Sequence, residues 1–216
     1  HNISGLPLAS TAKFTENGVI KEVGKGFWES AGKTLLKRVL IDTKKCTTAT
    51  IAVVEEPFSS KTVGEGFGGG APGAAGAPKP FAGAKKPPAG QSGDGNVAAL
   101  FAGPKELPKE GTVRPILFAN RLKVENGKIT EIQTIKAREK DFAFTVQKEL
   151  ETKDQDWDTI LPPEKRAPRK VLADAADNYF ALFAEGSEVS VPFAKVCDRW
   201  ENGFLTTGRD HDCSPV

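Results

Sequence analysis

The sequence predicts an α+β protein, in which a curved antiparallel sheet packs on helices and a partial second copy follows. The main observation is a phrase that occurs twice. Pro7-Leu8-Ala9 is followed by Glu16-Asn17-Gly18, and 185 residues later Pro192-Phe193-Ala194 is followed at the same spacing by Glu201-Asn202-Gly203. Stretches of period-two alternation, typical of strands, and one long helical pattern complete the prediction. Because an internal repeat decides architecture, we expect two copies of one unit, with only the start of the second present.

Composition excludes some classes of partner. The 216 residues carry 30 basic and 28 acidic side chains, a net charge of +2, so there is no electrostatic case for binding nucleic acid or an anionic membrane. No apolar run approaches the ~20 residues that cross a bilayer. The chain has no methionine and opens on His1. We therefore expect that an N-terminal piece has been removed, and a secretion signal could have gone with it.

The first part of the chain predicts strands around a short helix. Alternation over 12–20 predicts a strand that places Phe14 and Glu16 on one face. The glycines of 24–30 predict a turn into a short helix that stops near Gly32. The β-branched and aliphatic runs at 35–42 and 48–55 predict two further strands.

A glycine-, alanine- and proline-rich stretch then interrupts the pattern at about 59–108. Half of the chain's 22 glycines fall between Gly64 and Gly95. Such a segment buries too little apolar surface to offset the entropy of ordering it, so it is predicted to be a flexible insertion. It has no Gly-Lys-Ser/Thr sequence and is not a phosphate-binding loop.

Regular structure is predicted again from Thr112. Alternation before and after Asn126-Gly127 predicts a long antiparallel hairpin, because Asn-Gly readily adopts the positive φ angles of a type I′ turn. The polar stretch 142–165 is predicted to be a linker that packs against the protein as it passes, with Trp157 and Ile160-Leu161 as its anchors. The pattern at 169–185 predicts a helix with an apolar stripe that includes Tyr179.

The three cysteines are an odd number. Cys197 and Cys213 flank a turn-rich stretch and could close a short disulfide loop, or they could be two buried thiols. In the first case Cys46 is left over, and a partner in a missing N-terminal piece is one solution.

Several of these motifs together resemble a known family. They are the repeated phrase, the hairpin around Asn126-Gly127, Leu161-Pro162-Pro163, Tyr179-Phe180 and Cys197-x-Arg199-x-Glu201-Asn202-Gly203. They are similar to a largely fungal, SnoaL-like family of the NTF2-like superfamily, whose function is uncharacterised. The resemblance implies a cone-shaped pocket formed by a curved sheet around helices, tandem units and secretion. It places a first unit at 1–141 without its leading helix, a linker at 142–168 and a truncated second unit at 169–216. The helix 169–185 could substitute for the leading helix.

Candidate site residues are few. The only histidines, His1 and His211, lie near the chain ends, so an Asp/His pair in the first unit and a histidine-based metal site are not expected. Glu16 is a weak candidate for a catalytic carboxylate tuned by burial. Since Glu-Asn-Gly occurs three times, a structural turn is the stronger interpretation of Glu16.

The candidate pocket residues each have a structural alternative. They are Phe14, Trp28, Asn120 and Tyr179. Asn120 could direct a polar group into the pocket or be a satisfied buried amide, whereas Trp28 and Tyr179 could belong to the core.

We therefore expect a secreted protein that binds a small apolar molecule without a cofactor or metal. The resemblance adds that it could be a cofactor-free isomerase, cyclase or dehydratase. The alternative is a non-catalytic structural or protein-interaction module whose tandem units pair sheet to sheet. A homodimer through the sheet is a further expectation. Both hypotheses rest on analogy with proteins of similar fold, and a fold does not determine a function.

Overall fold

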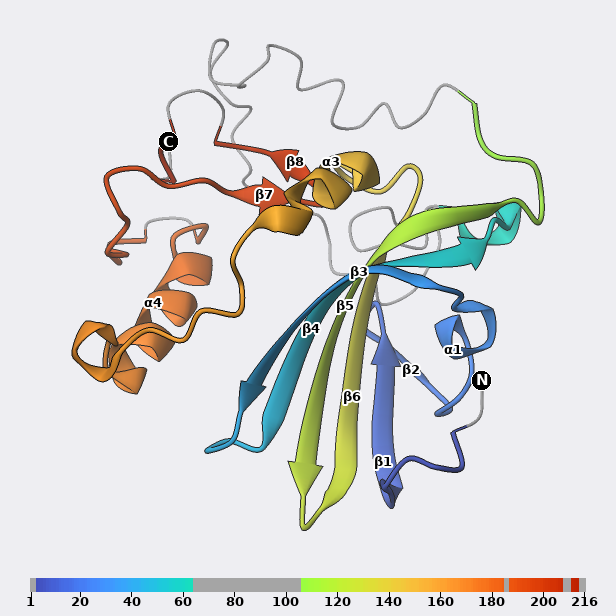
Figure 1. The fold of residues 1–216 in the computed structure, drawn as a ribbon, viewed down its shortest axis with the longest axis horizontal. Coiled ribbons are helices and arrows are strands. Elements are labelled where there is room, and N and C mark those ends of the chain that lie inside the picture. The colour runs from blue at the N-terminus through green and yellow to red at the C-terminus, as the bar shows by residue number, and fades with distance from the viewer. Residues whose placement is uncertain (1–2, 64–105, 185–186, 208–210, 214–216) are drawn as a thin grey trace. The chain divides into compact units, whose positions relative to one another are not determined.

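A computed structural model describes residues 3–63, 106–184, 187–207 and 211–213. It shows an α+β protein with a curved six-stranded sheet (Figure 1). The described residues form two compact units. Unit 1 contains 3–63, 106–154 and 202–204, and unit 2 contains the rest. Most of the insertion predicted at 59–108 lies outside the described residues.

The sheet of unit 1 has the strand order β2-β1-β6-β5-β4-β3. The strands are β1 (Leu8–Glu16), β2 (Val19–Lys21), β3 (Thr34–Asp42), β4 (Thr47–Pro57), β5 (Val113–Glu125) and β6 (Lys128–Ala137). The hairpin predicted at Asn126-Gly127 joins β5 and β6, and both turn residues have positive φ, as a type I′ turn requires.

Two expectations about the sheet are wrong. The strand predicted over 12–20 is two strands, because Asn17 and Gly18 adopt positive φ and turn the chain into an antiparallel β1–β2 hairpin. The sheet is also not wholly antiparallel, since β1 pairs with β6 in parallel. Parallel pairing requires a crossover between the strands, and here the crossover contains β3, β4 and β5.

The two faces of the sheet are covered by different elements. The front face, defined as the one that carries Phe14 and Glu16, packs against α1 (Phe27–Ser30) and the loop before it. The back face carries Val53 and Leu117. These alternate with front-face residues along β4 and β5, as pleated strands require.

The predicted linker contributes to the core of unit 1. Residues 146–151 form the helix α3 (Val146–Glu151), and Val146 is buried with Val53, Leu117 and Ala137 on the back face. The linker prediction overlooked this helix because its six residues are too few for a periodic pattern to stand out. The short 3₁₀ helices are Ser60–Thr62, Thr152–Asp154 and Pro163–Lys165.

Unit 2 contains the helix α4 (Arg169–Ala181), which is shorter than predicted. Tyr179 packs edge-to-face against Phe180, Phe183 and Phe193. The predicted anchors are wrong, because Ile160 is 81% exposed and Leu161 and Trp157 are also exposed. Their sequence is apolar, but no described element covers them.

The repeated phrase has the same local geometry in both places. The amide of Leu8 donates to the Leu6 carbonyl across Pro7, and the amide of Phe193 donates to the Val191 carbonyl across Pro192, both at 2.8 Å. Each copy then ends in an Asn-Gly turn with positive φ angles. In the second copy this turn joins β7 (Trp200–Glu201) to β8 (Phe204–Leu205). Equal sequence at this spacing therefore gives equal turns.

Candidate functional site

The front face of unit 1 contains a buried carboxylate, Glu16, at the end of β1. Its side chain accepts hydrogen bonds from the Lys21 Nζ at 2.8 Å and the Phe27 amide at 2.9 Å, and it forms an ion pair with Lys136. Gly26, with φ of 69°, lies against it. A Cβ at Gly26 would come within 2.8 Å of the Glu16 Oε2, so only glycine lets the chain pass this close to the carboxylate.

A second buried cluster lies beside it. Glu56 on β4 is opposite Arg114 on β5, and their charged groups approach to 2.8 Å. Arg138 also pairs with Glu56, and Arg114 reaches Glu139 at 2.9 Å. Together with Asp141, which accepts the Arg138 amide, the clusters contain four acidic and four basic side chains and are neutral overall.

Pairing controls the ionisation of these groups. Burial alone would raise the pKa of Glu16, but the hydrogen bonds from Lys136, Lys21 and the Phe27 amide outweigh it, so the Glu16 pKa lies below its ordinary value of 4.5. Burial would likewise raise the pKa of Glu56, and Arg138 and Arg114 lower it overall. Burial lowers the Lys136 pKa, against the opposing effect of Glu16. Glu16 is thus an ionised carboxylate held by cations.

This arrangement differs from a catalytic carboxylate tuned by burial. Such a general acid or base needs a pKa raised toward the working pH and free access to the substrate. Glu16 has a lowered pKa, and its oxygens are occupied by two lysines and one amide. The geometry therefore favours the structural interpretation of Glu16.

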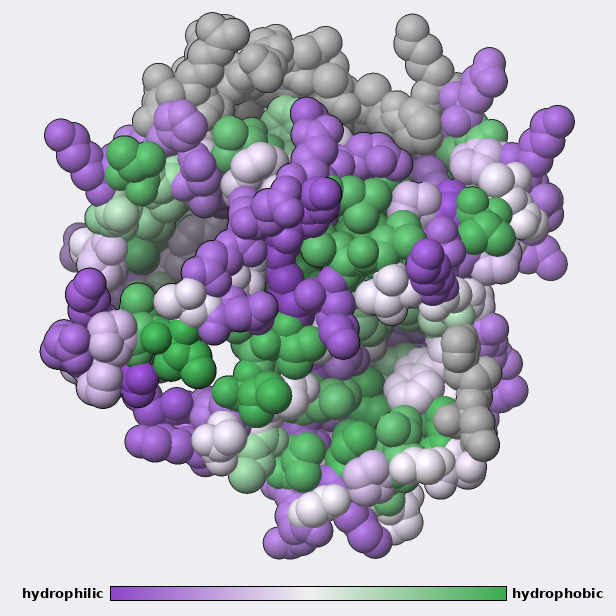
Figure 2. Space-filling model, in the orientation of Figure 1, coloured by the Kyte–Doolittle hydropathy of each residue, from purple (hydrophilic) through white to green (hydrophobic). Residues whose placement is uncertain are grey.

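A surface of apolar and polar residues lies on the same face, nearer β3. The half-buried Thr48 and Thr50 of β4 stand there between β5 and β3. Asn120 is half-buried on β5, and its amide nitrogen donates to the Thr134 Oγ1 at 3.0 Å and the Gln133 carbonyl at 3.3 Å. Among the described residues, none donates a hydrogen bond to the Asn120 Oδ1. Leu122 is half-buried nearby on β5, and Val39 and Ile41 are exposed on β3. Figure 2 shows hydrophobic side chains gathered over the lower part of the sheet.

The four predicted pocket residues fall into different environments. Phe14 is buried and packs edge-to-face on the half-buried Trp28, with ring centroids 6.1 Å apart, so these two rings belong to one apolar cluster. Asn120 lies on the same sheet face. Tyr179 belongs to unit 2, where it is part of the aromatic cluster of α4.

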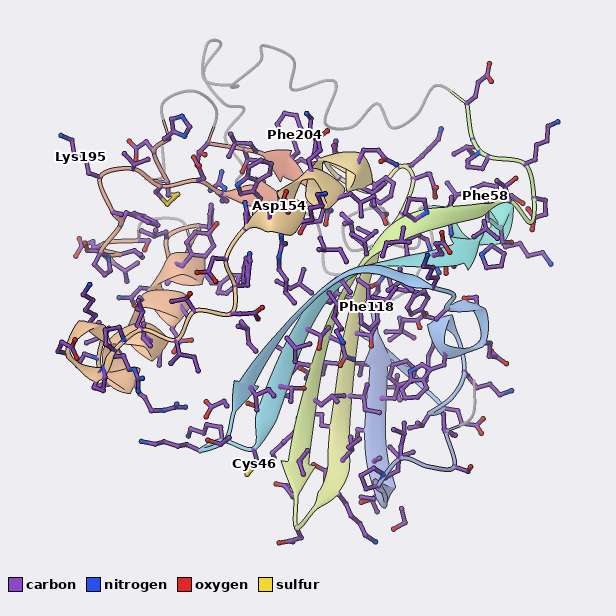
Figure 3. The ribbon with its side chains drawn as sticks, in the orientation of Figure 1. Cys46, Phe58, Phe118, Asp154, Lys195 and Phe204 are labelled. Atoms are coloured by element: carbon purple, nitrogen blue, oxygen red, sulfur yellow. A yellow bond between two sulfur atoms is a disulfide. The ribbon has the colours of Figure 1, made fainter. Side chains whose placement is uncertain are left out.

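The cysteines are arranged as follows. Cys197 and Cys213 form a disulfide in unit 2. Cys46 is free and exposed, in the turn between β3 and β4 (Figure 3). Across the disulfide loop, the Cys197 amide donates to the His211 carbonyl, and the His211 ring bonds to Asp198 at 2.5 Å.

The charged network was missed from the sequence. Lys136 shares a face of β6 with Ile132 and Thr134, and Arg138 follows directly after the strand at the next alternate position. Charges at such alternate positions next to an apolar run are a usable signal. The signal indicates inward-pointing cations but does not identify Glu16 and Glu56 as their partners. Those partners come from strands 120 and 82 residues away.

Among the described residues, no group of three or more His, Cys, Asp or Glu side chains is placed to hold a metal ion. None of the helices there is both long and apolar enough to span a membrane.

Residues 165–215 match the model of a family described as a domain of unknown function, DUF8021. The matched part contains α4, the disulfide and the second copy of the repeated phrase. No curated protein matches the chain, and no solved structure does.

Proposed function

We propose that the protein binds a small apolar molecule on the front face of its sheet, in an NTF2-like cone of the SnoaL-like kind. The observation that carries this proposal is the Asn120 Oδ1, to which no described residue donates. Leu122 lies on the same face, and Val39 and Ile41 lie beyond Thr50 and Thr48 of β4. Binding sites for small molecules are typically apolar with a few placed polar groups. The ligand class that fits is an apolar molecule with one hydroxyl or N–H donor.

The proposal is for binding without acid–base chemistry by Glu16. A carboxylate with a lowered pKa and two lysine partners is poorly suited to accept a proton from a bound molecule. Its contribution is instead to fix α1 and the loop before it against the sheet, since it accepts the Phe27 amide.

A first experiment locates the binding face with the probe 1-anilinonaphthalene-8-sulfonate. Val39 and Leu40 are neighbours on β3 with similar exposure, 42% and 48%, but they point to opposite faces. We expect Val39→Asp to weaken the binding of the probe by roughly tenfold, because a charge replaces apolar contact. Leu40→Asp is the matched control and should leave the affinity unchanged. Equal losses in the two variants would contradict the proposed face.

A second experiment tests the role of Asn120. The protein should bind 2-naphthol, which has a donor, about three- to tenfold more tightly than 2-methoxynaphthalene, which has none. Asn120→Leu should remove this preference while retaining the binding of both compounds. If the preference survives in Asn120→Leu, the free amide oxygen is not the polar contact.

A specific observation in unit 2 favours a second candidate function, a protein-interaction module. Phe180 is 74% exposed on α4, and Val196 and Ile160 are also exposed. Phe180 shares α4 with the exposed Val171 and Leu172, and exposed apolar residues that gather on one element are typical of surfaces that bind other proteins. In the probe titration, a loss of signal in Phe180→Ser but not in Val39→Asp would favour this function over the first.

A further inference from the structure

The two edges of the six-stranded sheet are unequal. One edge is β2, which has three residues, and the other is β3, which has nine. Among the described residues, no strand pairs with the outer side of β3. An unpaired edge presents free backbone donors and acceptors, and proteins usually protect it with short strands, charges, proline or bulges.

The second half of β3 lacks this protection. A bulge lies at its start, between Thr34 and Leu36, and the charged residues Lys37 and Arg38 follow. Arg38 is bent onto the back face, where it bonds to Glu149 and Thr152. Beyond it, Val39, Leu40 and Ile41 are all exposed, with Ile41 at 70%. This part of β3 is therefore an apolar, extended edge.

The pairing of β4 with β5 and β3 fixes which backbone groups of β3 point outward. Val124 on β5 donates its amide toward β4, to the Cys46 carbonyl. The direction of the backbone groups alternates along a strand, so the amides and carbonyls of Leu122 and its partner Thr48 point toward each other. The backbone groups of Thr47 and Ala49 therefore point toward β3. Those of their partners Asp42 and Leu40 point back toward β4. The amides and carbonyls of Val39 and Ile41 consequently point outward.

We propose that two copies of this chain join along β3, with the two strands antiparallel and Leu40 opposite the second copy's Leu40. This register places Val39 opposite the second copy's Ile41, and the outward backbone groups of these residues can exchange four hydrogen bonds across the pair. It forms one continuous sheet through both molecules.

The apolar residues select this register. It sets Val39 and Ile41 of one copy opposite Ile41 and Val39 of the second copy, with the two Leu40 residues opposite each other between them. Arg38 keeps its pairing with Glu149 and Thr152 of its own chain. A shift that centres the pairing on Val39 would instead place Lys37 opposite Ile41. A shift that centres it on Ile41 would place Asp42 opposite Leu40. Of these three registers, only the one centred on Leu40 sets apolar residues opposite apolar residues throughout Val39–Ile41.

The first test measures the mass of the full chain by light scattering, from about 1 µM to about 100 µM. We expect a concentration-dependent dimer. Ile41→Lys should raise its dissociation constant at least about tenfold, because a charge would face the second copy's Val39. Ile20→Lys is the matched control, since Ile20 is the same residue type, 83% exposed, on the opposite edge strand. A wild-type chain that stays monomeric throughout, or equal weakening by both variants, would overturn the proposal.

The second test reads the register directly in a Cys46→Ser background, which removes the exposed free thiol. Residues at a non-hydrogen-bonded antiparallel pair have Cα atoms about 4.5 Å apart. This lies within the range that a disulfide can bridge. Leu40→Cys should therefore form a covalent dimer on oxidation, whereas Val39→Cys should not, because its counterpart is Ile41. A dimer that cross-links through Val39→Cys, or through neither variant, would exclude this register.

Discussion

Unit 1 and unit 2 differ in how much apolar surface they bury. Among the described residues, every buried apolar side chain except Cys213 belongs to unit 1. Unit 1 also buries the ion pairs of Glu16 and Glu56. In unit 2 the helix α4 has no buried residue, and the disulfide Cys197–Cys213 is the main covalent constraint. A unit with a large apolar core can therefore accommodate buried charges, whereas the stability of a unit without such a core depends on a cross-link.

The largest effect is expected from the buried charges of unit 1. Glu56→Gln would leave Arg114 and Arg138 buried without their shared carboxylate. Removing one partner of a buried pair typically costs about 3–5 kcal/mol, which would appear as a loss in the free energy of unfolding measured with urea. Glu151→Gln breaks only an exposed pair with Lys148 and should change little. Equal stability of both variants would show that the buried network does not stabilise unit 1.

The pH dependence gives a second measure of the same network. A carboxyl group with a lowered folded pKa stabilises the protein fully above its unfolded pKa, and this stabilisation is lost as the pH falls through the folded pKa. The stability of the wild type should therefore decline below the ordinary value of 4.5, whereas the decline should be smaller in Glu56→Gln.

A smaller effect is expected from the disulfide of unit 2. The bridge joins residues 16 positions apart, and a loop of that size contributes about 3 kcal/mol. Cys197→Ser should therefore reduce the hydrogen-exchange protection of unit 2 amides, and the amides of β5 and β6 in unit 1 should be unaffected. Cys46→Ser is the control, since Cys46 is free and exposed. A uniform loss of protection in both units would contradict their separate stabilisation.

The smallest difference is expected between the two copies of the repeated turn. Gly18 and Gly203 both have positive φ, but a Cβ at Gly18 meets nothing within 4 Å, whereas one at Gly203 lies 2.3 Å from the Thr145 carbonyl oxygen. Gly18→Ala should cost about 1 kcal/mol from backbone conformation alone. Gly203→Ala should cost about 3 kcal/mol, because a clash is added. The free energies of unfolding of the two variants measure the difference, and equal values would mean that the second turn does not pack as closely as the structure shows.

Much of the fold could be predicted because its signals are local. The Asn126-Gly127 hairpin, the short helix α1 and the strands β3 and β4 follow from turn residues and alternation. The Asn17-Gly18 turn carried the same signal, yet a single strand was predicted there because apolar residues continue beyond it. The anchors failed for a different reason: the apolar character of Ile160 says nothing about whether another element covers it.

The candidate site was predictable only in part. The sequence singled out Glu16 and Asn120, and the structure gives each a defined set of partners. Lys136 and Arg138 escaped notice, because a cation on a strand is usually exposed. Their burial depends on carboxylates that are distant in sequence.

The sequence by itself determined the turns of this protein, including the shared geometry of the two repeated phrases, because φ preferences and hydrogen bonds across a few residues are local. Only the tertiary structure decided that β1 pairs with β6 in parallel, that Glu16 meets Lys136, and that β3 is an edge. These outcomes depend on which distant segments lie side by side, and their energies appear only when the whole sheet has assembled.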